Sequence, residues 1–197
     1  MKYTGNQSSA TIGHGLDSAP EMIIAKSTTV AQNWAVYHKD VGNQYWLRLN
    51  GTNAKQDEAI WNDTTPTDSV FSLNGNVVIN ASGSTNIAYC FHSVDGYQKV
   101  GSYGGSNPTR QTITTGFLPR FVMIKSTNTA KDWYIFDNQR FSNNEYDAYL
   151  FANSSAQEAY LPNLSNYTVE FLDNGFSVQD GSGLNLTGTN YIYLAIA

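Results

Sequence analysis

The chain has 197 residues, of which only 14% are charged, and its formal net charge is −5. An average soluble domain has about 25% charged residues, so the polarity here comes mainly from Asn, Ser, Thr, Gly and Tyr. No run of Lys or Arg supplies the electrostatic attraction that phosphate-backbone binding needs, which argues against nucleic acid as a partner. Cys90 is the single cysteine, so no intrachain disulfide can form and the fold depends on packing.

The amino-terminal ten residues are polar and lack the apolar segment of a signal peptide. No stretch approaches the roughly 18 apolar residues that a membrane span requires. We therefore expect no membrane insertion and synthesis in the cytoplasm of the producing cell. A virus assembled inside its host and released by lysis is compatible with this expectation.

Short runs rich in β-branched and aromatic residues alternate with Gly, Asn, Asp and Ser clusters, a pattern typical of strands joined by turns. In chain order, strands are predicted over residues 21–27, 34–38, 45–49, 69–73, 77–80, 86–92, 99–103, 120–126, 133–137, 148–151, 169–172, 175–179 and 190–195. Short helical turns are predicted over 53–61 and 154–160. The unbroken apolar runs at 22–25 and 121–124 predict central strands that are covered on both faces.

The two halves of the chain repeat one another, which is the strongest signal in the sequence. Residues 20–28 reappear as 119–127, and residues 33–37 reappear as 132–136, both at an offset of 99. Further matches pair Leu49, Gln56 and Asp57 with Leu150, Gln157 and Glu158 (offset 101), Phe71 with Phe176, and residues 85–89 with 189–193 (offset 104). The last of these gives Cys90 the counterpart Leu194.

These features predict an all-β fold, a jelly-roll-like β-sandwich built from two internally duplicated units, residues 1–101 and 102–197. Two arrangements are open: two tandem sandwiches, or one larger sandwich with approximate twofold symmetry. Residues 102–110 are short and lead directly into the next strand, unlike a flexible linker. We therefore expect the two units to pack as one compact body.

The usual catalytic signatures are missing: there is no Gly-x-Ser-x-Gly elbow, phosphate-binding loop, His-Glu-x-x-His or Cys-x-x-Cys motif. Cys90 lies in an apolar strand and is predicted to be a buried thiol. His14, His38 and His92 are not repeated in the second half, and their spacing matches no metal-ligand pattern. The sequence therefore predicts no metal site, no cofactor and no cysteine nucleophile.

Carboxylates bear on a second kind of chemistry, because glycan cleavage normally needs two of them about 5 to 9.5 Å apart. Asp57 with Glu58, and Glu145 with Asp147, are the only close pairs. Both halves share Gly, Pro, Lys and Trp positions instead, including Lys26 with Lys125. Each Lys follows an apolar run, where its amine is predicted to reach a turn carbonyl. We therefore predict a duplicated scaffold and no enzyme.

Binding is favoured by 13 Tyr and four Trp on a weakly charged chain. Aromatic faces stack on apolar patches while amides and hydroxyls supply hydrogen bonds, as in interfaces with carbohydrate or protein. Trp46 and Trp61 lack Trp counterparts and are predicted to lie near loops. They are the candidate exposed binding residues, with a place in the core as the alternative.

Several segments together point to a known family: residues 19–24, 33–37, 61–66, 80–83, 88–91, 96–97 and 99–103. With these segments the chain resembles an uncharacterised β-rich domain family found in virion proteins of marine tailed bacteriophages, including tail-fibre-like proteins. The resemblance covers nearly the whole chain and implies a virion structural protein. The family carries no assigned catalytic or binding residues, so none is transferred.

The sequence departs from a trimeric fibre because it shows no coiled-coil heptads, no collagen-like tract and no long amino-terminal anchor. We therefore expect a non-enzymatic virion structural protein on the particle surface, as a capsid decoration or head-surface protein or a small tail accessory. The expected partners are other virion proteins, and association with further copies of the chain is left open. The alternative is a tail-fibre-type adhesin that binds a host surface carbohydrate.

Overall fold

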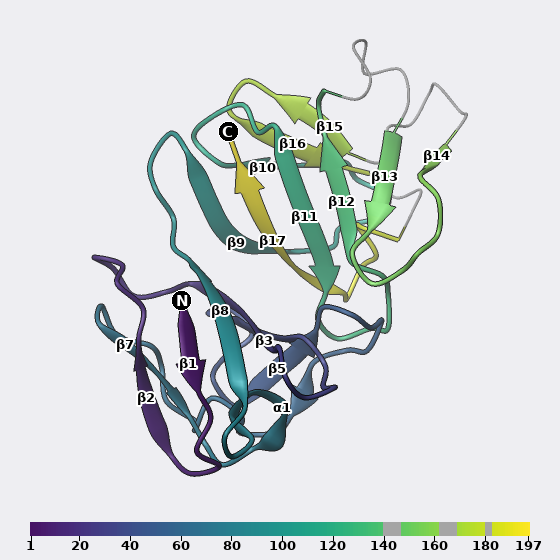
Figure 1. Cartoon of the computed structure of the whole chain (residues 1–197). Coiled ribbons are helices and arrows are strands. Elements are labelled where there is room, and N and C mark those ends of the chain that lie inside the picture. The colour runs from purple at the N-terminus through teal and green to yellow at the C-terminus, as the bar shows by residue number, and fades with distance from the viewer. Residues whose placement is uncertain (140–146, 162–168, 180–182) are drawn as a thin grey trace. The chain divides into compact units, whose positions relative to one another are not determined.

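The computed structural model describes residues 1–139, 147–161, 169–179 and 183–197 (Figure 1). The chain divides into two compact units, Met1–His92 (unit 1) and Ser93–Ala197 (unit 2). All pairings between named strands are antiparallel, and each unit is a pair of sheets, which confirms the predicted all-β, duplicated β-sandwich. The unit boundary lies before the strand predicted over 99–103, which therefore belongs to unit 2. That the two units pack as one body stays a prediction.

Unit 1 combines a six-stranded sheet, a two-stranded sheet and one helical turn. The large sheet has the order β1 (Lys2–Thr4), β8 (Thr85–Phe91), β3 (Met22–Ser27), β4 (Ala35–His38), β5 (Tyr45–Arg48) and β6 (Gln56–Asp57). The small sheet pairs β2 (Ala10–Gly13) with β7 (Val70–Leu73), and α1 (Val77–Asn80) follows β7.

Unit 2 repeats this plan. Its large sheet has the order β14 (Ala159–Leu161), β13 (Asp147–Phe151), β12 (Tyr134–Asp137), β11 (Phe121–Ser126), β17 (Asn190–Ile196) and β9 (Gln98–Gly104). Its small sheet has the order β10 (Gln111–Thr114), β16 (Gly175–Val178) and β15 (Val169–Leu172). Strand β9 lies beside β17 as β1 lies beside β8, so the edge strand of the large sheet is also duplicated (Figure 1).

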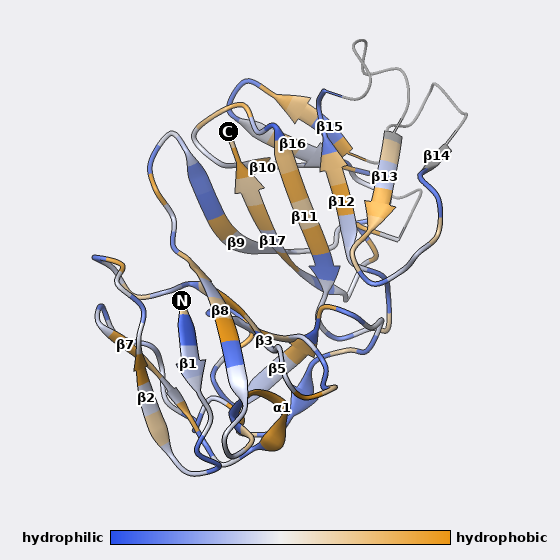
Figure 2. Ribbon diagram, in the orientation of Figure 1, coloured by the Kyte–Doolittle hydropathy of each residue, from blue (hydrophilic) through white to orange (hydrophobic). Residues whose placement is uncertain are grey.

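The strands β3 and β11 are central in their sheets, as their apolar runs predicted. Every residue of β3 except Lys26 is buried, and every residue of β11 except Phe121. Figure 2 shows β11 in hydrophobic colours along most of its length and in hydrophilic colours at its end, where Lys125 and Ser126 lie. Because neighbouring side chains of a strand point to opposite faces, both faces of these strands are covered.

Each unit has its own aromatic core between its two sheets. In unit 1 the Trp61 ring contacts Tyr37 and Phe71 edge-on, with centroid separations of 5.8 and 6.3 Å. In unit 2 Phe176 contacts Tyr193 edge-on at 5.2 Å. Phe71 and Phe176, matched in the sequence, occupy the same place, since Phe71 pairs with Ile12 and Phe176 with Ile113.

A buried asparagine closes each unit. The Asn80 side chain accepts a hydrogen bond from the Asn6 amide (2.9 Å) and donates to the carbonyls of Ser8 (2.7 Å) and Asn74 (2.6 Å). In unit 2 the Asn185 side chain accepts from the Ser106 amide (2.8 Å) and donates to the Thr109 carbonyl (2.9 Å). Each amide joins the segment after the edge strand of its unit, β1 or β9, to the segment before the last strand, β8 or β17.

Two alignments between the halves are wrong at the level of strand register. Ala35 pairs with Arg48, and Tyr134 pairs with Phe151, so β5 and β13 correspond at an offset of 103 rather than 101. Met22 pairs with Phe91, and Phe121 pairs with Ile196, so β8 and β17 correspond at 105 rather than 104. A shift of one residue exchanges the two faces of a strand. The change from 104 to 105 therefore matches each residue of β8 with a residue on the opposite face of β17 from the one that the sequence alignment gave it.

Some predicted elements also differ from the structure. Residues 77–80 form α1 rather than a strand, because the Asn76 side chain caps the turn by accepting from the Val78 amide at 2.9 Å. The segments predicted as helical turns, 53–61 and 154–160, contain β6 and part of β14 instead. Strands β1, β2 and β10 were not predicted, since each is short and contains polar residues that weaken the strand signal.

Candidate binding groove

The two tryptophans predicted as exposed binding residues lie in the core of unit 1. Trp46 is 1% exposed and Trp61 is 2% exposed. Trp46 points into the core from β5, and its indole N–H donates to the Glu58 carboxylate at 3.2 Å. Neither ring can stack on a ligand in this structure, so the expectation of exposure is wrong and the alternative, a core position, holds for both.

Tyr89 is the aromatic residue that the corrected register reveals. The sequence alignment matched it with Tyr193, but the strand pairing makes Leu194 its equivalent, since Ile24 pairs with Tyr89 and Met123 pairs with Leu194. Tyr89 is 49% exposed, whereas Leu194 is 4% exposed. At this position of the large sheet, unit 1 therefore has a large exposed ring and unit 2 has a buried aliphatic side chain.

Tyr89 lines an open groove of about 410 Å³ on unit 1, which we call the Tyr89 groove and define by residues 26–31, Trp34, Ile87 and Tyr89. Lys26 pairs with Ile87 across β3 and β8. Ala25 pairs with Ala35, the first residue of β4, in an antiparallel arrangement. Trp34, which precedes β4, therefore lies beside Lys26. Because side chains two residues apart share a face, the sheet brings Lys26, Ile87 and Tyr89 to the same surface.

The rim of the groove is the turn after β3. Thr28 donates its amide and its hydroxyl to the Thr85 carbonyl (2.8 and 3.0 Å), and the Thr29 hydroxyl accepts from the Thr85 amide (2.9 Å). The buried Ser27 hydroxyl accepts from the Val30 amide at 3.2 Å. These bonds fix the turn against β8, so the groove has a defined wall.

The polar groups of the groove are only partly used by the protein. The Lys26 ammonium donates to the carbonyls of Ser27 (2.7 Å) and Val30 (3.5 Å), which confirms the predicted contact with a turn carbonyl. An ammonium has three donors, so one N–H remains. Among the residues that the structure describes, Lys26 forms no ion pair, and the Trp34 indole N–H and the Tyr89 hydroxyl have no hydrogen-bond partner.

The equivalent lysine and tryptophan of unit 2 are in a different environment. Lys125 and Trp133 are both buried, at 0% and 1% exposure. Lys125 donates to the Ser126 carbonyl at 2.8 Å, as Lys26 does to Ser27. Burial lowers the pKa of Lys125 to about 8, against the smaller opposing effect of Asp132. The duplicated pair thus lines an open groove in unit 1 and is enclosed in unit 2.

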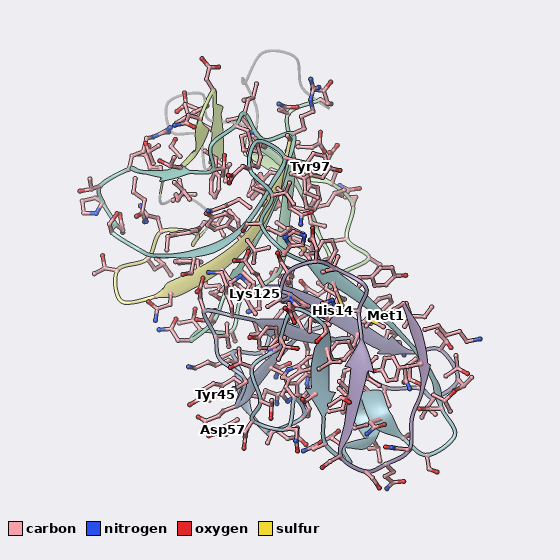
Figure 3. All side chains as sticks on the ribbon, turned by 90° about the vertical axis from the view of Figure 1, so that its left-hand side faces the viewer. Met1, His14, Tyr45, Asp57, Tyr97 and Lys125 are labelled. Atoms are coloured by element: carbon pink, nitrogen blue, oxygen red, sulfur yellow. The ribbon has the colours of Figure 1, made fainter. Side chains whose placement is uncertain are left out.

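A second hollow of about 270 Å³ shares Tyr89 and contains Met1, His14 and Cys90 (Figure 3 labels Met1 and His14). Burial raises the pKa of the Cys90 thiol to about 11, so it is protonated at neutral pH. The His14 ring is already engaged, with Nδ1 accepting from the Leu16 amide and Nε2 bonded to the Thr67 carbonyl. Cys90 packs against the core as predicted, but it is only partly buried.

The other candidate groups have structural contacts. The buried His38 ring accepts from the Asp40 amide (3.2 Å), and His92 lies 3.6 Å from the Asp17 carboxylate. Tyr45 and Asp57 are a cross-strand pair at the edge of the sheet (Figure 3). Within the described ranges no three His, Cys, Asp or Glu side chains gather as metal ligands.

Of the two carboxylate pairs noted in the sequence, the structure describes the side chains of Asp57 with Glu58 but not those of Glu145 with Asp147. Glu58 is exposed, and its carboxylate accepts from the Trp46 indole and from the Asn76 side-chain amide (2.5 Å), so it braces the loop over the core. Glu145 lies outside the described residues, and so does the side chain of Asp147. The structure therefore does not test this pair.

Comparison with known proteins shows the family of the chain. Residues 1–197 match the family described as a domain of unknown function (DUF7483), and the chain belongs to this family. No curated protein and no solved structure is significantly similar to it. In the part of the chain that the structure covers, none of the helices has the length and apolar character to span a membrane.

Proposed function

We propose that the protein is a non-enzymatic structural component of a bacteriophage virion, exposed on the particle surface as a capsid decoration or head-surface protein or a small tail accessory. The observation that carries the proposal is the duplicated sandwich. Both copies keep the buried amides of Asn80 and Asn185 and the core rings of Phe71 and Phe176. The resemblance of the sequence to virion proteins supplies the context. A protein whose role is its shape keeps such residues in both copies.

Its expected partners are other virion proteins, and its expected location is the assembled particle. Mass spectrometry of purified particles, together with labelling of the chain for electron microscopy, tests both. A decoration protein is expected in many copies on the head, and a tail accessory in few copies at the tail. Absence of the chain from mature particles would contradict the proposal.

A second candidate function is a receptor-binding adhesin for a host surface carbohydrate. The Tyr89 groove favours it, because an open hollow with an exposed aromatic ring and unused hydrogen-bond donors has the composition of a ligand site. The test is binding of the purified chain to host cells and to their isolated surface polysaccharide. Binding to neither would remove this candidate and leave the virion proposal untouched, whereas release of reducing sugar from the polysaccharide would contradict a non-enzymatic role.

A further inference from the structure

We infer that the Tyr89 groove binds a pyranose ring that carries a carboxylate, as in a uronic acid residue of an acidic glycan. The inference deepens the adhesin candidate and rests on it. It commits to one site per chain, in unit 1, because unit 2 has Leu194 where unit 1 has Tyr89. In this inference the aromatic rings contact the apolar face of the sugar, the Lys26 ammonium contacts its carboxylate, and the polar groups of the groove bond its hydroxyls.

The ring faces come from Tyr89 and Trp34, which line the groove with Ile87. A pyranose has an apolar face of C–H groups and an equator of hydroxyls, so it fits a surface that combines the exposed Tyr89 ring and the half-buried Trp34 ring with hydrogen-bonding groups. The Trp34 indole N–H, the Tyr89 hydroxyl and the Thr29 hydroxyl are available as donors in the described structure. A groove of about 410 Å³ lies within the range of small-ligand sites, about 300 to 1,000 Å³.

The preference for an acid comes from Lys26. Its ammonium is held over the turn by two backbone carbonyls and has no carboxylate partner in the described structure, unlike Lys39, which pairs with Asp40 at 3.0 Å. The chain as a whole carries a net charge of −5 and repels an acidic glycan. Because salt screens distant charges beyond about 8 Å at physiological ionic strength, an adjacent cation decides the interaction, and hydrogen bonds to a charged group are the stronger ones.

The experiment compares two ligands that differ only at the carboxyl group, a trimer of galacturonic acid and its methyl ester, because esterification removes the negative charge. Isothermal titration is expected to show binding of both, with the acid about tenfold tighter and its advantage lost in high salt. Tyr89→Ala is expected to remove binding of both ligands, and Tyr89→Phe to retain it. Lys26→Met is expected to weaken the acid to the level of the ester and to leave the ester unchanged.

The matched control is Tyr97→Ala, which removes a somewhat more exposed ring, 57% exposed, from unit 2 (Figure 3). It is expected to bind both ligands as the unaltered protein does. A measurement on the unaltered chain guards against variants that fail to fold. In a spectrum of the four indole N–H groups, the ligand is expected to shift the Trp34 signal and leave those of the buried Trp46, Trp61 and Trp133 in place.

Equal affinity for acid and ester in the unaltered protein would overturn the inference, as would a shift of any indole signal other than that of Trp34. Binding of neither trimer would also overturn it. Retained binding of Tyr89→Ala to host polysaccharide would keep the adhesin candidate and reject the groove. Conversely, binding with the expected pattern by a chain that is absent from virions would keep the groove and reject the virion proposal.

Discussion

The two units share the hydrogen bonds and close backbone contacts that hold each unit together, and they differ on the outer surface of the large sheet. Tyr3 donates its hydroxyl to the Ile79 carbonyl at 2.8 Å, and Tyr103 donates to the Leu184 carbonyl at 2.9 Å. Gly5 and Gly105 both leave no room for a Cβ, because backbone carbonyls lie 2.2 and 2.1 Å from where it would stand. Shared backbone bonds and close approaches of this kind depend on the whole unit, so both copies retained them.

The difference lies in the positions that point away from each core. Tyr89 is exposed in unit 1, while its equivalent Leu194 is buried in unit 2. Lys26 and Lys125 make the same bond to the next carbonyl, yet only Lys26 lines an open groove. The two copies thus share one scaffold and differ in the exposure of the outer face of the large sheet.

The largest expected effect tests the shared part. Asn80→Ala and Asn185→Ala each remove the hydrogen bonds of a buried side-chain amide to partly buried backbone groups, and each lost partner costs about 1 to 3 kcal/mol. We expect either variant to lower the free energy of unfolding by about 4 kcal/mol, measured by chemical denaturation. Asn6→Ala, which loses one exposed side-chain bond to the Ser8 amide, is the control and is expected to cost less than about 1 kcal/mol. A large loss in one unit and none in the other would show that the two amides are not equivalent.

The central strands could be predicted from the sequence because their apolar runs are long and their duplicated letters are unambiguous. The register of β8 with β17 could not. Thr85 and Asn86 repeat as Thr189 and Asn190, but the hydrogen bonds follow the backbone: Thr28 donates to the Thr85 carbonyl, and Thr127 to the Asn190 carbonyl. The identical letters are therefore one residue out of register, which tertiary pairing decides and local similarity does not.

The candidate site could be predicted from the sequence only in part, because its residues depend on the same strand register. The sequence identifies Lys26 and Trp34 as duplicated positions and so predicts that they belong to the scaffold, yet both line the groove. Tyr89 was missed because the slipped alignment matched it with Tyr193, a core residue. Trp46 and Trp61 are not duplicated, which favours a separate binding role, but both pack in the core between the sheets. Exposure depends on which face a strand turns to solvent, and a register error of one residue inverts that assignment.

The next effect sharpens the comparison of the two lysines. Burial lowers the pKa of Lys125 from 10.5 to about 8, so between these values the unfolded chain binds more protons than the folded one. Stability from this group therefore rises with pH across that window and is constant below it. At about 1.4 kcal/mol per pKa unit, the rise is at most about 3.5 kcal/mol.

Denaturation of the unaltered chain and of Lys125→Met between pH 7 and 10.5 measures this rise as a difference. The buried tyrosines and Cys90 have raised pKa values and lower the stability at the alkaline end, but they contribute equally to both proteins and cancel. The advantage of the unaltered chain over the variant is expected to grow from pH 8 upward. A difference independent of pH would show that the Lys125 amine is not desolvated.

A reciprocal exchange at Tyr89 and Leu194 tests the divergence of the two surfaces. Leu194→Tyr places a larger, polar ring where the side chain is 4% exposed, and overpacking costs about 1 to 3 kcal/mol. Tyr89→Leu changes an exposed side chain and is expected to stay within about 0.5 kcal/mol. Thermal unfolding of both variants measures the asymmetry. Equal losses would mean that the two positions are not as different as their exposures indicate.

The smallest effect decides between the two registers directly. With β8 and β17 aligned at an offset of 105, the equivalent of Cys90 is Ala195, which is 0% exposed. With the sequence alignment, the equivalent is Leu194. Cys90→Ala is then expected to cost less than about 1 kcal/mol, because it removes only a partly buried sulfur, while Cys90→Leu must enlarge a site packed against the core and is expected to cost more. Denaturant midpoints of the two variants give the ranking. A leucine variant more stable than the alanine variant would favour the sequence alignment over the alignment by strand pairing.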